Sequence, residues 1–205
     1  MNTSDTKNKI LDTAERLFAR QGIGATSLRA IVREAGLNVA AIHYHFGSRE
    51  ALVLEVFNRR LKPINQQRVA RLEELEQTRS PAIPLNDLVR AFLEPVFSYF
   101  YDQPPQVRGL MARLHTEPDV TRPVLQQYHE ILQRFQGAFL NAAPWLNPEQ
   151  VRYRMSFMIG SMGIMLSGRH PAFCGKNGAR LKPEQLFEEV IQYNTAGLSA
   201  GAPKK

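Results

Sequence analysis

Two short helical patterns that meet at a glycine constrain this chain more than any other feature. In the first pattern apolar residues recur at the spacing of one helix face, and Thr26 or Ser27 stands where an N-cap belongs. Gly36 follows the last apolar residue and can adopt the left-handed backbone that ends a helix. Asn38 is placed to cap a second short helix. Two short helices joined by a glycine-containing turn predict a helix-turn-helix.

The second helix of this pair is expected to present a mixed outer surface. Its apolar residues share one face, which leaves Ala40, His43 and Tyr44 turned mostly outward. A helix is slim enough to enter the DNA major groove, about 12 Å wide, and small alanines let its backbone approach base edges. Asn38, His43 and Tyr44 carry hydrogen-bonding groups for bases or phosphates. A helical hairpin in an ordinary bundle is the alternative, because short helix pairs are common in all-α proteins.

The sequence around the helix pair has the order found in one family of regulators. Gly47 and Ser48 mark a break and the start of another helix, and an upstream helix ends at Gln21–Gly22. The segment from about Lys9 to Leu52, which ends in the letters IHYHFGSREAL, resembles the N-terminal DNA-binding domain of TetR/AcrR-type transcriptional regulators. The resemblance rests on order, spacing and position together.

The resemblance implies a set of DNA contacts. Tyr44 and the helix start at Ser48 and Arg49 would contact phosphates. His43 replaces one of two adjacent aromatics usual in the family, and Gly47 stands where a lysine is frequent. Two roles are therefore open for His43, a phosphate contact or a base contact. The predicted DNA-binding residues are Thr26, Ser27, Asn38, Ala40, His43, Tyr44 and Arg49.

The charge of the chain is uneven. Residues 1–62 carry ten Lys and Arg against six Asp and Glu, a net +4 of the total +7. The N-terminal part is therefore the more basic per residue, which suits a surface that faces phosphates.

Other sequence features bear on the compartment. The longest apolar run, Met155–Ser167, is shorter than the roughly 20 residues that a bilayer helix needs. The N-terminus lacks the apolar core of a secretory signal. The single cysteine, Cys174, indicates a reducing compartment and is expected to be an inert loop thiol. We predict a soluble, cytoplasmic protein without a membrane partner.

Enzymatic chemistry has little support in this sequence. His43 and His45 lie about 200° apart around a helix, so they cannot share a metal ion. The His-Glu-x-x-His motif, the P-loop and the nucleophile elbow do not occur in the sequence. We predict no catalytic residues, no metal and no cofactor.

The remainder of the chain keeps helical periodicity and lacks alternating strand patterns, so the predicted fold class is all-α. A kink or break is expected at Pro63, and one long helix is expected from about Val120 to Leu140. The predicted domains are a three-helix helix-turn-helix domain (1–48), a connecting helix region (49–77), a larger all-α ligand-binding and dimerisation domain (78–200) and a disordered tail (201–205).

Aromatic residues and methionines in the C-terminal domain are mainly core, but they could also enclose an apolar cavity with a few polar anchors. A single arginine or histidine there would suit a carboxylate or phosphate, as in a fatty acid or acyl thioester, and a planar aromatic compound is equally open. The candidate pocket residues are Phe92, Phe97, Arg113, His115, Tyr128 and Met158.

The last two helices suggest how two copies would assemble. Small residues at spacings of four, three and four form one stripe, which would let two helix backbones approach closely. The candidate dimer-interface residues are Ser156, Gly160, Gly163 and Ser167, with Leu186 and Val190 on the final helix. Packing within one chain is the alternative, and the family resemblance implies the homodimer.

Together these features predict a ligand-responsive, sequence-specific regulator that binds double-stranded DNA. We expect a repressor that a small hydrophobic effector releases from a palindromic operator. The alternative is an all-α ligand carrier or interaction protein without specific DNA binding.

Overall fold

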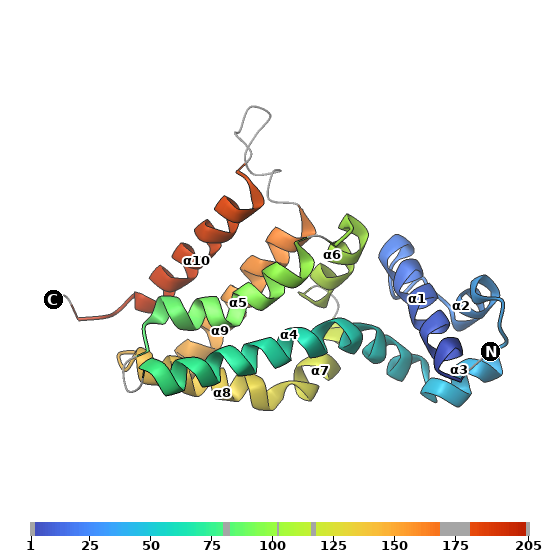
Figure 1. The fold of residues 1–205 in the computed structure, drawn as a ribbon, viewed down its shortest axis with the longest axis horizontal. Coiled ribbons are helices and arrows are strands. Elements are labelled where there is room, and N and C mark those ends of the chain that lie inside the picture. The colour runs from blue at the N-terminus through green and yellow to red at the C-terminus, as the bar shows by residue number, and fades with distance from the viewer. Residues whose placement is uncertain (1–2, 80–82, 102, 116–117, 169–180, 204–205) are drawn as a thin grey trace.

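The computed structural model describes residues 3–79, 83–101, 103–115, 118–168 and 181–203. Cys174 and the predicted loop around it lie outside these ranges. The described residues form ten α-helices and a short 3-10 helix, and none of them is in a strand, which confirms the all-α prediction (Figure 1). None of the helices within these ranges is long and apolar enough to cross a membrane.

Most of the helices from α1 to α9 follow one another with short connections. Three short N-terminal helices precede one long helix, and the remaining helices form a bundle beside it (Figure 1). Their bounds are α1 (Thr3–Gln21), α2 (Leu28–Ala35), α3 (Val39–Phe46), α4 (Arg49–Arg79), α5 (Leu85–Phe100), α6 (Pro105–Ala112), η1 (Arg113–His115), α7 (Pro118–Gln127), α8 (His129–Ala142), α9 (Pro148–Ser167) and α10 (Pro183–Ser199).

The helices α1, α2 and α3 form the head of the molecule with the first turns of α4. Phe18, Ile31 and Ile42 are buried at its centre, one from each of the three helices. Gly36 ends α2 in the left-handed conformation with φ +63°, where a residue with a Cβ would be strained. The predicted helix-turn-helix therefore forms, and its turn depends on this glycine.

The long helix α4 continues through Pro63 and runs from the head to the bundle as one ribbon (Figure 1). Of the two predicted outcomes at Pro63, a kink or a break, the break does not occur. A proline inside a helix removes one backbone hydrogen bond. Burial of Ile64 and Leu72 against neighbouring helices offsets that loss, since α4 packs on α5, α7 and α8.

The bundle is built around α5, which contacts α4, α8 and α10. Phe92 of α5 and Phe135 of α8 meet edge to face with ring centroids 5.0 Å apart, and Phe139 is buried beside them. The helix α6 contacts both α9 and α1. The guanidinium of Arg113 lies close to Gly22, so that a Cβ at Gly22 would be 3.5 Å from Arg113 Nη1. The bundle thus contacts the head directly as well as through α4.

The prediction of one helix from Val120 to Leu140 is wrong, because the chain breaks at Tyr128. The backbone there has φ −104° and ψ 19°, outside helical values, and separates α7 from α8. The Tyr128 hydroxyl donates a hydrogen bond to Asn58 Oδ1 of α4 at 3.1 Å. This long-range contact holds the ring at the bend.

Candidate nucleic-acid interface and ligand cavity

The helix α3 divides sharply into a buried and an exposed side. Ile42 is fully buried, whereas Ala40, His43 and Tyr44 are exposed, with 77% of Tyr44 accessible. Asn38 caps the helix, since its Oδ1 accepts a hydrogen bond from the Ala41 amide at 3.0 Å. The outward face predicted for α3 is therefore present.

The ring of His43 is held at the C-terminal end of α3. Its Nδ1 lies 3.1 Å from the carbonyl oxygen of Gly47. A carbonyl oxygen only accepts, so Nδ1 carries the proton in this contact, and Nε2 of the neutral ring is an acceptor. Gly47 itself has φ +75°, a backbone that favours glycine over the lysine frequent in the family.

The two residues before α2 have different environments. Ser27 is exposed and caps α2, with its Oγ accepting from the Ala30 amide at 3.1 Å. Thr26 is 1% exposed, and its hydroxyl donates to the Gly22 carbonyl at 2.7 Å and accepts from Gln21 Nε2 at 3.2 Å. The prediction of Thr26 as a DNA-binding side chain needs correction, because the fold buries its hydroxyl and occupies it with one donated and one accepted hydrogen bond.

Arg49 links the start of α4 to the loop before α2. Its Nη2 donates to the carbonyl oxygens of Ile23 and Thr26, and the residue is half-buried. Ser48 caps α4 through a hydrogen bond from the Ala51 amide to its Oγ at 3.0 Å. Arg49 thus brings a positive charge to the end of the head that Ser27 also occupies.

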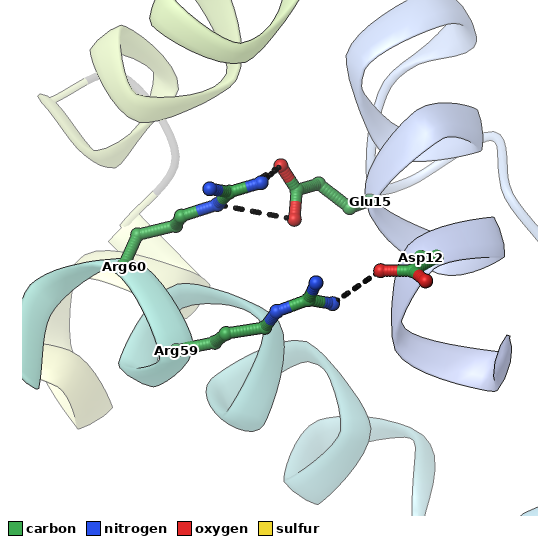
Figure 2. Close-up of polar contacts among 4 residues, drawn as sticks. All are labelled: Asp12, Glu15, Arg59 and Arg60. Carbon is green, nitrogen blue, oxygen red and sulfur yellow. Dashed lines mark hydrogen bonds and ion pairs between the residues drawn. The ribbon is translucent and has the colours of Figure 1, made fainter. Parts of the chain in front are cut away.

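Two ion pairs join α1 to α4 (Figure 2). Arg60 donates to Glu15 through Nη2 at 2.6 Å and through Nε at 3.1 Å. The Glu15 side chain is only 8% exposed, whereas Asp12, which pairs with Arg59, is 55% exposed. Burial lowers the pKa of Arg60, but hydrogen bonding to Glu15 and to Tyr99 of α5 outweighs this and raises it above its ordinary value. Arg60 therefore connects the head, the long helix and the bundle.

A cavity of about 350 Å³ lies among the helices α4 to α9. Its wall is largely apolar and includes Leu93, Val96 and Ile159. Arg68 and Asn65 of α4 are among the few polar residues that line it. An apolar cavity with few polar groups has the form of a small-molecule site.

The predicted pocket residues have several different environments. Tyr128 lines the cavity, and Phe97 lines a smaller hollow of about 190 Å³ between α5 and α10. Phe92 and Met158 are fully buried and fill the core instead, which corrects their assignment. Arg113 lies against Gly22 of the head, and the side chain of His115 lies outside the described part of the structure.

Arg68 is the cavity residue that the sequence analysis missed. It stands four residues after Ile64 and four before Leu72, both fully buried, so it falls on the inward stripe of α4. A charged residue within an apolar helix stripe was the signal that could have identified it.

The small-residue stripe of α9 is only partly covered by the rest of the chain. Gly163 is buried within the chain, so its assignment to a dimer interface needs correction. Ser156 and Gly160 line the cavity, but Ser156 is exposed and Gly160 is half-buried with open space at its Cβ position, so their place in a dimer interface stays a prediction. Ser167, at the end of the same stripe, is half-buried.

The exposed apolar face of α9 consists of Tyr153, Phe157 and Ile164, which are 58%, 64% and 52% exposed. They occur at i, i+4 and i+11, which is one helix face. On α10, the half-buried Leu186 and Val190 share a face with Tyr193, which is 70% exposed. Each of the last two helices therefore presents large apolar side chains outward.

Comparison with known proteins agrees with this architecture. Residues 10–56 match the model of bacterial regulatory proteins of the tetR family, and residues 90–197 match the tetracyclin repressor-like C-terminal domain. The chain is 34% identical to the HTH-type transcriptional regulator AcrR of Shigella flexneri over 84 residues, 41% of this chain and 37% of that protein. It is 34% identical to the regulator LmrA of Bacillus subtilis over 101 residues, 49% of this chain and 50% of that protein. The matches thus span half or less of these curated relatives.

Solved structures show the same fold over nearly the whole chain. NalD, the secondary repressor of the MexAB-OprM multidrug efflux pump in Pseudomonas aeruginosa, is 23% identical with a TM-score of 0.67, covering 96% of this chain and 97% of that one. A TetR-family structure from Shewanella sp. PV-4 is 20% identical with a TM-score of 0.63, covering 92% and 97%. Since the C-terminal model alone matches more than half of the residues, this chain belongs to the TetR family of bacterial regulatory proteins, a non-enzymatic family.

Proposed function

We propose that this protein is a homodimeric repressor that binds a palindromic DNA operator and leaves it when a small, largely hydrophobic effector fills the cavity. The observation that carries this proposal is the exposed face of α3. Its polar groups contribute little to the core, and the cap by Asn38 fixes the start of the helix that carries them. The similarity of this chain to the regulators AcrR and LmrA and to the repressor NalD also supports the proposal.

The proposed DNA surface comprises α3 and the two helix starts beside it. Tyr44 and Ser27 expose hydroxyl groups that suit phosphate oxygens, and Arg49 supplies positive charge. Asn38 and Ala40 stand at the exposed N-terminal end of α3, the part of a recognition helix that approaches base edges. Thr26 acts indirectly, by holding the loop that carries Ser27.

His43 is assigned to base reading. With Nδ1–H donated to Gly47, the outward Nε2 of a neutral imidazole is an acceptor. Phosphate oxygens are acceptors too, so they do not suit it. The exocyclic amino groups of adenine and cytosine donate in the major groove and do suit it.

Effector response is proposed to operate through α4, because this helix borders both sites. It begins beside the DNA surface at Arg49 and contributes Asn65 and Arg68 to the cavity wall. An effector that favours a different position of α4 would move the head through the Arg60–Glu15 pair and shift the population away from the DNA-bound form.

Dimerisation is proposed through the exposed apolar faces of α9 and α10. Two copies joined there would form a four-helix interface that removes Tyr153, Phe157 and Tyr193 from water. Two recognition helices held about 34–36 Å apart would read a palindrome.

The test is selection of bound duplexes from a random DNA pool by the purified full-length protein at near-physiological salt. A palindromic motif with half-sites about one helical turn apart is expected. His43→Phe should select a motif altered at one position of each half-site, whereas Gln126→Phe, a change at an exposed position on α7, should select the original motif. A folded dimer that enriches no motif would instead support an all-α carrier.

A further inference from the structure

Arg68 is held in a fixed position on the cavity wall. Its Nε donates to the Phe92 carbonyl oxygen at 2.8 Å, and its Nη1 donates to Asn65 Oδ1 at 2.9 Å. The guanidinium also lies 4.0 Å from the centroid of the Phe92 ring. These contacts set the orientation of the planar guanidinium before any ligand arrives.

Among the described residues, the partners of Arg68 carry no negative charge. The Phe92 carbonyl and the Asn65 amide are neutral groups. By contrast, Arg60, Arg71 and Arg90 each pair with a glutamate. Within the described ranges no carboxylate forms an ion pair with Arg68. Burial lowers the pKa of Arg68 to about 9, so it still carries its charge at neutral pH.

A half-buried cation whose described partners are all neutral is only partly compensated. Removing a charge from water costs free energy that neutral partners only partly offset. Guanidinium has five N–H donors, and the two bonds to described residues use two of them. The remaining donors can bind an acceptor inside the cavity.

The rest of the cavity determines the body of the ligand. Leu93, Val96, Met111 and Ile159 line it with apolar groups, which suit a hydrocarbon or aromatic body. The volume of about 350 Å³ lies near the lower end of the range of small-molecule sites, about 300–1,000 Å³. A cationic compound would be repelled by the positive charge of Arg68.

We propose that the effector is a small apolar compound with one carboxylate, which Arg68 binds in the cavity between α4 and α9. This inference rests on the proposed function, because it names the chemical class of that effector. A carboxylate can accept two parallel hydrogen bonds from a guanidinium, and its single negative charge neutralises the single positive charge of Arg68. A phosphate dianion would leave a negative charge uncompensated in an apolar cavity.

The experiment compares three ten-carbon probes by calorimetric titration of the full-length protein: decanoate, decanol and decyltrimethylammonium. Decanoate should bind about tenfold more tightly than decanol, because hydrogen bonds to charged groups are the stronger ones. The cation should bind more weakly than decanol. A preference for the alcohol or the cation, or no binding of any probe, would overturn the proposal.

Two variants test whether Arg68 causes the preference. Arg68→Met removes the charge, and Arg68→Gln also removes it but keeps an N–H donor for the Phe92 carbonyl. In both variants the ratio of the decanol Kd to the decanoate Kd should fall to about one. Arg79→Met removes an equal charge from the exposed end of α4 and should keep the tenfold ratio. A tenfold ratio in either folded Arg68 variant would contradict the assignment.

DNA binding by the same preparations separates this inference from the proposed function. A protein that binds a selected duplex but shows no carboxylate preference would refute the role of Arg68 alone. A protein with the Arg68-dependent preference but without specific DNA binding would refute the regulator and leave the carboxylate site standing in a carrier.

Discussion

Tyr44 on α3 and Phe157 on α9 are both exposed aromatic residues, but their surroundings differ completely. Tyr44 follows the exposed His43 and its ring meets the ring of His45 edge to face, so its neighbours are polar. Phe157 stands one turn from Tyr153 on a face that continues to Ile164. A polar surface is stable in water by itself, whereas a continuous apolar face is favoured when another surface covers it. Exposure of an aromatic ring therefore indicates a partner only together with its neighbours.

The largest expected effect concerns the apolar face. Phe157→Arg would place two positive charges in a symmetric interface and should weaken dimerisation about 100-fold, or about 2.7 kcal/mol. Analytical ultracentrifugation over a range of concentrations measures the dimer dissociation constant. Gln126→Arg adds the same charge on exposed α7 and should leave the dimer unchanged. An unaltered dimer in Phe157→Arg would show that another surface joins the two copies.

The joint between head and bundle should give the next largest effect. Glu15→Gln leaves Arg60 facing a neutral group in a mostly buried site and should lower the free energy of unfolding by about 2 kcal/mol. Asp12→Asn removes the exposed partner of Arg59 and should cost less than about 0.5 kcal/mol. Urea denaturation followed by circular dichroism measures both. Equal losses would mean that burial does not distinguish the two pairs in Figure 2.

A smaller effect is expected at the polar face. Tyr44→Ala should weaken binding of the selected duplex about tenfold, about 1.4 kcal/mol, and change the free energy of unfolding by less than about 0.5 kcal/mol. Fluorescence anisotropy with labelled duplex gives the affinity. Tyr44→Phe, which lacks only the hydroxyl, should lose about threefold if hydrogen bonding to phosphate contributes part of the effect. Wild-type affinity in Tyr44→Ala would remove this residue from the DNA surface.

The smallest effect concerns pH. Hydrogen bonds from Arg90 hold the pKa of Glu188 below its ordinary value of 4.5. Because the folded-state pKa is the lower one, the pair stabilises the fold above pH 4.5, and this contribution is lost as the pH falls through the folded-state pKa. With 47% of Glu188 exposed, the loss should be only a few tenths of a kcal/mol. Urea midpoints between pH 6 and pH 3 should fall slightly less in Glu188→Gln than in the wild type. A larger fall in the variant would reverse the sign.

The head could be predicted from the sequence because its structure depends on neighbours in the chain. Gly36 ends α2, Asn38 caps α3 and Ser48 caps α4, each through contacts within a few residues. Spacing alone reveals such features. The burial of Thr26 escaped prediction, since a threonine before a helix is equally suited to an exposed cap.

The bundle could be predicted only in outline, because its decisive contacts join distant residues. The hydrogen bond from Tyr128 to Asn58 joins the bend between α7 and α8 to the distant α4. No local pattern marks the break at Tyr128. The cavity draws its wall from the six helices α4 to α9 and from η1, so no single helix pattern identified it. Which residues of α9 line the cavity also depends on how this helix packs on the others. Ser156 and Gly160 are among them, which the sequence pattern did not indicate.

The division of α3 into a buried Ile42 and an exposed remainder has a consequence for how this regulator can evolve. Substitutions at Ala40, His43 and Tyr44 would change the proposed DNA surface and leave the core intact. New operator preferences can therefore arise by single mutations that the fold tolerates. A mutation at Ile42 has no such freedom, so descendants of this protein can diverge in the genes they control while they keep the same scaffold.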